Sequence, residues 1–154
     1  MIRRTYPQTR LRRTRVKGSI RDLIAQNKLT TDDLIQPIFI ADQSEDKIEI
    51  PSMPGIHRHN LDSLYFEVES LINEGIKSVA IFPAIDASKK DEDGSHALDE
   101  GNIVCSSLAG LSERFPEIIK IADVALDPYT DHGHDGLLID GRVDNDKTVL
   151  LLQN

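Results

Sequence analysis

The stretch DVALDPYTDHGHDG, residues 123–136, holds the densest group of side chains in this chain that could do chemistry. Carboxylate oxygens suit Mg²⁺, which keeps several waters and takes one or two carboxylates. Two histidines with a carboxylate suit Zn²⁺ instead. Aspartates in turns also accept backbone N–H bonds without any catalytic role, and the spacing alone favours this structural interpretation. The residues concerned are Asp123, Asp127, Asp131, Asp135, His132 and His134.

Sequence signatures of several enzyme classes are absent. The chain contains neither the phosphate-binding pattern GxxxxGK[ST] nor the dinucleotide-binding pattern GxGxxG. The segments GSH (94–96) and GLSE (110–113) do not form the nucleophile elbow of a serine hydrolase. The sequence therefore gives no support to a serine triad or to a nucleotide-binding loop.

Size and composition predict one domain with a hydrophobic core. The chain has 154 residues, of which 39% are hydrophobic and 29% are charged. No apolar run approaches the roughly 18 residues of a membrane helix, so no membrane partner is expected. The single cysteine, Cys105, cannot form an internal disulfide, which favours a reducing, cytoplasmic setting. Cys105 lies in a probable helix and is expected to be buried.

Charge is distributed unevenly along the chain. Eight basic residues precede the first acid, Asp22, whereas the remainder carries 10 basic and 26 acidic residues. Such a basic segment suits nucleic acid, an acidic neighbouring subunit or a solvated tail. Tyr6 is its only aromatic residue, so we expect a protein contact and no nucleic-acid partner. The basic residues are Arg3, Arg4, Arg10, Arg12, Arg13, Arg15, Lys17 and Arg21.

Hydrophobic periodicity predicts strands and helices in alternation. Ser19 is the expected N-cap of the first helix, and Gly75 is expected to end the second. Pro37 counts against a central place in the sheet for its strand. The expected elements are an extended arm (1–18), a helix (19–27), a strand (33–41), turns (47–60), a helix (61–75), a strand (77–85), a helix (102–115), a strand (117–127), a hairpin turning at Asp140-Gly141 (137–146) and the start of a helix (147 onward).

This order indicates an α/β fold with a parallel sheet and right-handed crossovers. In such sheets the chemistry lies beyond the carboxyl ends of the strands. The candidate loops are therefore 42–60, 83–101 and 124–136. Asp123 closes the last strand and is expected to point into the cleft.

Several segments resemble one enzyme family in the same order. DVALDPYTDHGHDG is similar to the signature of the delta-aminolevulinic acid dehydratases, also called porphobilinogen synthases. Residues 10–40, RLRRTRVKGSIRDLIAQNKLTTDDLIQPIFI, resemble the arginine-rich arm and first strand of that family. IPSMPGIHRHNLDSL (50–64), GIKSVAIFPAI (75–85) and the DND-T pattern at 144–148 also fit. The resemblance covers the whole chain, and its last motif is highly specific.

The resemblance implies a fold, an activity and a partner. The family condenses two molecules of 5-aminolevulinate into porphobilinogen, an early step of tetrapyrrole (heme) biosynthesis. Its fold is a TIM (β/α)₈ barrel preceded by an extended N-terminal arm, and its arms embrace neighbouring subunits in an octamer. By this resemblance residues 1–18 are an extended basic arm that makes a homo-oligomer, and residues 19–154 are the N-terminal part of the barrel, with about three strands.

The resemblance also bears on the metal. The zinc-using branch carries three cysteines where this chain has Ala125, Asp127 and Asp135. Thiolates prefer Zn²⁺ and carboxylates prefer hard cations. The chain therefore resembles the branch without the cysteine zinc site, and Asp127 and Asp135 are candidate ligands for Mg²⁺. Asp123 matches the supporting active-site aspartate of the family.

The two lysines that form Schiff bases in the family have no good counterpart here. Such a lysine must be partly neutral. Lys77 and Lys120 lie near strand starts, and Lys89 and Lys90 lie among acids that raise a lysine pKa. In the family both lysines come from the second half of a barrel of about 250 residues. We therefore expect them beyond Asn154 and expect this chain alone to be inactive.

A second hypothesis is that the chain is a non-catalytic assembly module. Three strands of a barrel leave sheet edges and apolar faces uncovered. Such a chain associates through its arm and its exposed edges. Deleting the arm separates this hypothesis from the enzymatic one.

Overall fold

The computed structural model describes residue 5 and residues 7–153 of the chain. Contacts divide the chain after Thr30 into two units, which are described separately. In the first unit the 3-10 helix η1 (Arg13–Arg15) precedes helix α1 (Gly18–Ile24), and neither contains a buried residue. The arm of residues 1–18 stays a prediction, and its residues 1–4 and 6 lie outside the described part of the chain.

Helix α1 differs from the predicted helix at both ends. It begins at Gly18 with Lys17 in the N-cap position, so the N-cap prediction for Ser19 was wrong. It ends at Ile24, because Ala25 already has an extended backbone. A helix this short gains little from propensity alone and needs packing to continue, and α1 has no buried side chain.

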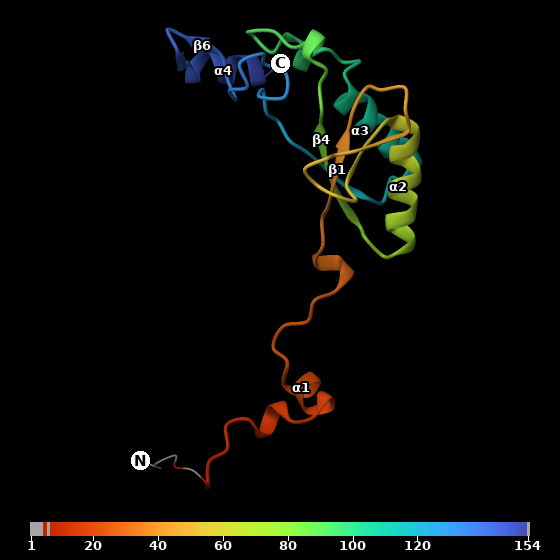
Figure 1. Cartoon of the computed structure of the whole chain (residues 1–154), viewed down its shortest axis with the longest axis vertical. Helices are drawn as coiled ribbons and strands as arrows, with labels where there is room; N and C mark the ends of the chain where they lie inside the picture. The colour runs from red at the N-terminus through yellow and green to blue at the C-terminus, as the bar shows by residue number, and fades with distance from the viewer. Residues whose placement is uncertain (1–4, 6, 154) are drawn as a thin grey trace. The chain divides into compact units, whose positions relative to one another are not determined.

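The second unit is built on a five-stranded sheet of order β2-β3-β1-β4-β5. Figure 1 shows its inner strands β1 and β4 side by side. β1 pairs in parallel with β4, and β4 pairs in parallel with β5, as the alternation of elements predicted. β2 and β3 form an antiparallel pair in the segment that was predicted as turns only, and β3 runs parallel to β1. The bounds are β1 (Gln36–Ile40), β2 (Lys47–Glu49), β3 (His57–His59), β4 (Ser78–Pro83) and β5 (Ile119–Ala122).

Pro37 is tolerated in β1 although β1 is an inner strand. On one side it pairs in register with Ala80 of β4. On the other side β3 pairs only with Phe39 and Ile40. A missing N–H is costly where both edges of a strand are paired, and here only one edge is.

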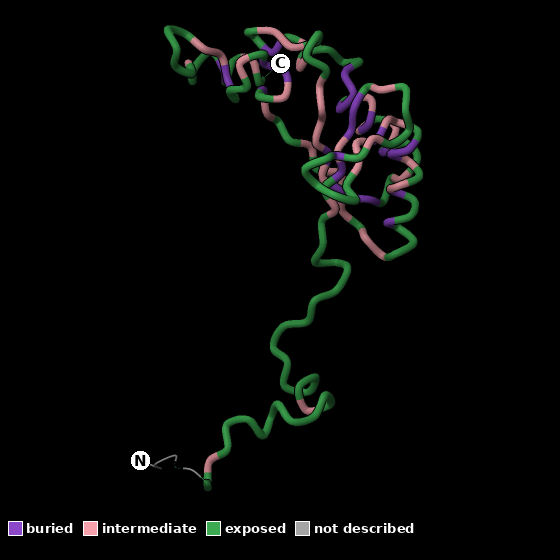
Figure 2. Tube along the Cα trace, in the orientation of Figure 1, coloured by how far each residue is buried: buried purple, intermediate pink, exposed green. Residues whose placement is uncertain are grey.

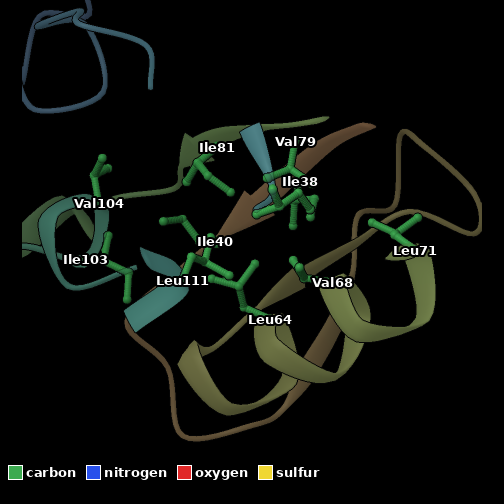
Figure 3. Packing of buried hydrophobic residues seen from close by; sticks show 11 residues of the cluster. Ile38, Ile40, Leu64, Val68, Leu71, Val79, Ile81, Ile103, Val104 and Leu111 are labelled. Atoms are coloured by element: carbon green, nitrogen blue, oxygen red, sulfur yellow. The ribbon is translucent and has the colours of Figure 1, made fainter. Parts of the chain in front are cut away.

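Helices α2 (Leu61–Asn73) and α3 (Ile103–Arg114) pack on the same face of the sheet. Each starts at an asparagine whose side-chain oxygen accepts backbone N–H bonds, Asn60 for α2 and Asn102 for α3. Gly75 follows α2 with a φ of +90°, as predicted for its C-terminus. Buried residues gather where the helices meet the strands (Figures 2 and 3). The core consists of Ile38, Ile40, Leu64, Val68, Leu71, Val79, Ile81, Ile103, Val104, Leu111 and Ile118.

The opposite face of the sheet is also apolar, but it is less covered. Side chains alternate along a strand, so the register places Phe39, Phe82 and Ile121 on this second face. The rings of Phe39 and Phe82 lie 6.0 Å apart. Ile119 and Ile121 of β5 are 58% and 38% exposed. A sheet with two apolar faces is typical of a barrel wall.

The C-terminal part forms a hairpin and a helix. β6 (Leu138–Ile139) pairs antiparallel with β7 (Arg142–Val143). Asp140 and Gly141 between them have φ of +51° and +74°, which confirms the predicted turn. Helix α4 (Asn145–Leu152) follows, with Asp144 accepting the N–H of Lys147 at its N-cap. Within the described residues every helix is too short or too polar to cross a lipid bilayer.

Replacing Gly110 by alanine should reveal how closely α2 approaches α3. A Cβ at this position would lie 2.0 Å from the Tyr65 hydroxyl oxygen. We expect Gly110→Ala to lower the free energy of unfolding by about 1–3 kcal/mol, because overpacking forces side chains to move. Urea denaturation measures the change. In a Tyr65→Ala background the same change should stabilise the chain, since alanine is the better helix former. A gain in stability in the unmodified chain would contradict the packing argument.

Candidate functional site

The candidate site lies at the carboxyl ends of β1, β4 and β5. These strands are parallel, so the loops that follow them emerge at one edge of the sheet. The loop after β4 contains the short helices η3 (Ala87–Lys89) and η4 (Ser95–Leu98). Residues 123–137, called the aspartate loop below, follow β5 and lead to the hairpin.

Asp123 is the first residue after β5, at the strand end where it was expected, although the predicted strand ran on to residue 127. It is exposed and lines a cavity of about 240 Å³ between the aspartate loop, α3 and α4. The walls of this cavity are mostly apolar, and they include Cys105, Tyr129 and Leu151. Cys105 is exposed, so its predicted burial was wrong, because its side of α3 faces this opening and not the sheet.

Asp135 closes the aspartate loop on itself. Its Oδ1 accepts the backbone N–H of Leu126 at 2.7 Å. Asp127 lies in the turn that follows Leu126 and is exposed. One of the two predicted metal ligands therefore already has a structural bond, which is the role that the turn chemistry favoured. The other faces solvent.

The two histidines of the aspartate loop shape its tip. His134 donates its backbone N–H to Nδ1 of His132 at 3.1 Å. Nδ1 is then an acceptor, so Nε2 of His132 carries the proton and donates to the carbonyl of Glu92 at 3.1 Å. Thr130 donates its hydroxyl to the carbonyl of His134 at 2.9 Å. The ring of His132 thus bonds loop backbone on both of its nitrogens, and it lies 5.4 Å from the ring of His134 between centroids.

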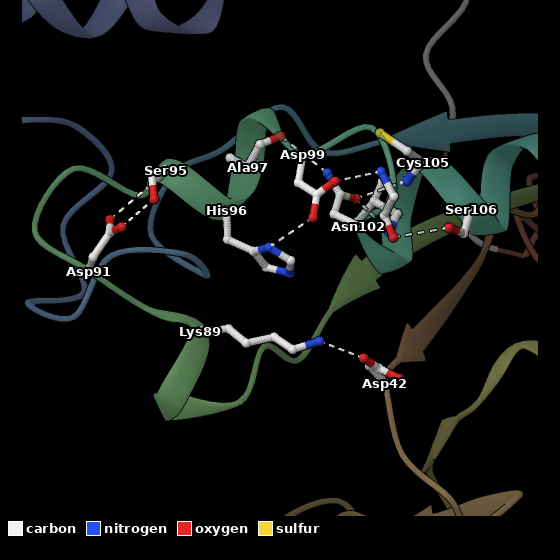
Figure 4. Close-up of polar contacts among 12 residues, drawn as sticks. Asp42, Lys89, Asp91, Ser95, His96, Ala97, Asp99, Asn102, Cys105 and Ser106 are labelled. Atoms are coloured by element: carbon white, nitrogen blue, oxygen red, sulfur yellow. Dashed lines mark hydrogen bonds and ion pairs between the residues drawn. The ribbon is translucent and has the colours of Figure 1, made fainter.

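A second, more polar cavity of about 180 Å³ lies between the ends of β1 and β4 (Figure 4). Lys89 crosses it to Asp42, with Nζ 2.5 Å from Oδ2. The hydrogen bond to Asp42 raises the pKa of Lys89, with Asp86 contributing in the same direction. The acidic neighbours in the sequence predicted this direction of the pKa shift, but they did not identify Asp42 as the partner. His96 lines the same cavity, with Nδ1 3.6 Å from Oδ2 of Asp99.

Tyr129 packs inside the aspartate loop. It is 6% exposed, and its ring lies 6.1 Å from that of His96. Burial raises the pKa of Tyr129 to about 12. The phenol therefore stays protonated at neutral pH and can donate a hydrogen bond but not serve as a base.

The residues at this edge do not form a complete metal site. Across residue 5 and residues 7–153, no three His, Cys, Asp or Glu side chains are placed to hold one ion. A site made only of protein ligands, such as tetrahedral zinc, does not fit this arrangement. A cation that keeps most of its waters needs only one or two carboxylates.

Comparison with known proteins identifies the family. The family model described as delta-aminolevulinic acid dehydratase matches residues 8–154. The chain belongs to the delta-aminolevulinic acid dehydratase family. The match includes the aspartate loop, and it agrees with the resemblance seen in the sequence.

This chain matches only part of the length of individual members of the delta-aminolevulinic acid dehydratase family. The enzyme of Bradyrhizobium diazoefficiens is 44% identical over 93% of this chain and 40% of its own length. That of Chlamydia pneumoniae is 43% identical over 94% of this chain and 44% of its own length. A Toxoplasma gondii structure, solved with the reaction product porphobilinogen, superposes with a TM-score of 0.89 at 36% identity, over 94% of this chain and 42% of its own. The chain thus spans less than half the length of these relatives.

The stability of the fold should depend on Tyr129 at alkaline pH. An unfolded tyrosine ionises near pH 10, whereas the folded pKa of Tyr129 is about 12. The stabilisation is complete below pH 10 and is lost as the pH rises towards 12, by up to about 3 kcal/mol. Denaturant unfolding between pH 8 and pH 11 measures the slope, and Tyr129→Phe should flatten it. Equal slopes in the two proteins would refute this assignment.

Proposed function

We propose that these 154 residues form the first part of the catalytic barrel of a cytoplasmic porphobilinogen synthase, a lyase that condenses two molecules of 5-aminolevulinate. The observation that carries the proposal is the superposition on a porphobilinogen synthase bound to its product, with a TM-score of 0.89. The apolar second face of the sheet supports it, because a closed barrel would bury Ile119 and Ile121. In this proposal Asp123 supports the reaction from the end of β5.

The lysines of this chain support the proposal that the Schiff-base amines lie elsewhere in the enzyme. A nucleophilic lysine must be partly neutral. Lys77 lies 2.6 Å from Asp32, Lys47 lies 3.1 Å from Glu67, and Lys89 has Asp42 as described above. Nζ of Lys120 donates to the carbonyl of Phe115 at 3.4 Å, on the helix-facing side of β5. The bond to Asp42 raises the pKa of Lys89 and so favours its charged form, and none of these four lysines lies in the aspartate loop.

The proposal predicts that activity needs both parts of a barrel. We expect no porphobilinogen from 5-aminolevulinate when residues 1–154 are assayed alone. Mixing them with the part of the Bradyrhizobium diazoefficiens relative that they do not match should restore product formation. Asp123→Asn should abolish the restored activity, whereas Asp140→Asn, in the exposed hairpin turn, should leave it unchanged. Turnover by the isolated chain, or borohydride trapping of substrate on one of its lysines, would overturn the proposal.

We further propose that Mg²⁺, and not cysteine-bound Zn²⁺, associates with Asp127 and Asp135. Support comes from the donor chemistry, since two carboxylates and Ala125 stand where the zinc-using branch has thiols. When bound, the ion would supply positive charge at the loop. The exposed Asp127 and the second oxygen of Asp135 fit an ion held largely through water.

Calorimetric titration with MgCl₂ tests the magnesium proposal. Asp127→Asn should weaken Mg²⁺ binding, because it removes a charge without touching the Asp135–Leu126 bond. Asp131→Asn, a loop aspartate outside the proposed pair, serves as the matched control and should bind as the unmodified chain does. Identical titrations of all three proteins would contradict the assignment.

We propose that the basic N-terminal segment makes the contact between subunits of a homo-oligomer. Its described basic residues, from Arg10 to Arg21, are all exposed. The rest of the chain carries more acidic than basic residues, so its surface has the opposite charge to this segment.

Deleting residues 1–18 should lower the mass of the particle in solution. Light scattering coupled to size exclusion measures it. Exchanging the arginines at 12, 13 and 15 for glutamine is the control that keeps the chain length and should have a similar effect at low salt. An unchanged oligomer after deletion would argue against association through the arm.

A further inference from the structure

The aspartate loop is joined by its backbone to the loop after β4. The N–H of Asp91 donates to the carbonyl of Tyr129 at 3.3 Å, and the N–H of Asp131 donates to the carbonyl of Asp91 at 3.0 Å. Asp91 and Thr130 thereby form a parallel β-bridge. Asp91, in the loop between β4 and α3, therefore bonds two backbone groups of the aspartate loop, the carbonyl of Tyr129 and the N–H of Asp131.

The side chain of Asp91 organises its own segment, DEDGS (residues 91–95). Oδ1 accepts the N–H of Asp93 at 3.1 Å and that of Ser95 at 2.9 Å, and Oδ2 accepts the Ser95 hydroxyl. The Ser95 hydroxyl is the main cause that lowers the pKa of Asp91. The carboxylate is therefore ionised at neutral pH and holds three donors at once.

Two further contacts fit the DEDGS segment against the aspartate loop. Gly94 has a φ of +65°, and a Cβ there would lie 3.3 Å from Cγ2 of Thr130. The segment approaches the loop this closely because a glycine adopts that backbone without strain. The carbonyl of Glu92 accepts the proton of His132 Nε2, as described above. Backbone pairing, close approach and a side-chain bond thus all join the same two segments.

We propose that Asp91 is a positioning residue for the aspartate loop. Its carboxylate fixes the conformation of the DEDGS segment, and the backbone of that segment sets the place of the loop at the strand ends. The inference rests on the proposed function in one respect, which is that the aspartate loop contains Asp123. Among the described residues, the pairing of Asp91 with Thr130 is the one β-bridge outside the named strands.

Amide hydrogen exchange of the full 154-residue chain, followed by NMR, tests this proposal without substrate. In Asp91→Ala the amide of Asp131 should exchange about tenfold faster or more, as expected for a lost hydrogen-bonded contact. Amides inside β4, such as that of Ile81, should keep their protection. Asp93→Ala removes the same charge two residues away and should leave Asp131 unchanged. Asp91→Asn keeps Oδ1 as an acceptor and should restore most of the protection.

Two outcomes would overturn the proposal. In the first, Asp91→Ala accelerates only the amides of residues 93–95 and leaves Asp131 protected. In the second, the amides of β4 lose protection equally, so that Asp91 would serve the whole domain and not the loop. If Asp91→Ala does not fold, Ser95→Ala removes one donor and keeps the charge. It should accelerate the Asp131 amide to a smaller extent, and an unchanged rate there also counts against the proposal. Since no turnover is measured, these results are independent of the proposed activity.

Discussion

The parallel pairing of β1, β4 and β5 is the constraint on which the rest of this structure depends. Parallel strands place their carboxyl ends at one edge, so the loops after β4 and β5 must meet there. The pairing is held in register by the apolar layer beneath α2 and α3. A slip of one residue would turn Ile38 and Ile40 away from the helices and lose several kcal/mol, since each buried side chain of this kind contributes about 1.5–3 kcal/mol. The geometry of the candidate site thus follows from core packing.

The same sheet has a second apolar face that the described residues of the chain leave partly uncovered. The second face of the sheet presents aromatic and branched side chains, and β5 at the edge is the least covered strand. Hydrophobic surface of this kind is buried in a barrel, where the interior is filled by side chains from all strands. Covering this face would remove the exposed side chains of Ile119 and Ile121 from water, which is the favourable term in burying apolar surface.

Much of the fold could be predicted because its signals are long or chemically specific. The period of α2, the apolar run of β4 and the Asp-Gly turn each identified an element correctly. β2 and β3 were missed, since three residues are too few to show an alternation. The sequence showed that Asp123 ends a strand, but not that Asp135 bonds Leu126, because that partner is chosen by the path of the loop. The hydrogen bonds of the Asp91 side chain were missed for the same reason.

Many of the aspartates at this edge of the sheet hold loop structure and are not available for proton transfer. Asp86 accepts from Ser88, Asp99 from the N–H of Gly101, and Asp135 from the N–H of Leu126. Hydrogen bonds from Ser88, its hydroxyl first, lower the pKa of Asp86 and keep that carboxyl ionised. A carboxylate that holds backbone donors stabilises a loop and is a weak base. Asp123 differs, because it lines an apolar cavity beside a buried, protonated tyrosine. The other three aspartates thus build the loops, and of the four only Asp123 lines this mostly apolar cavity.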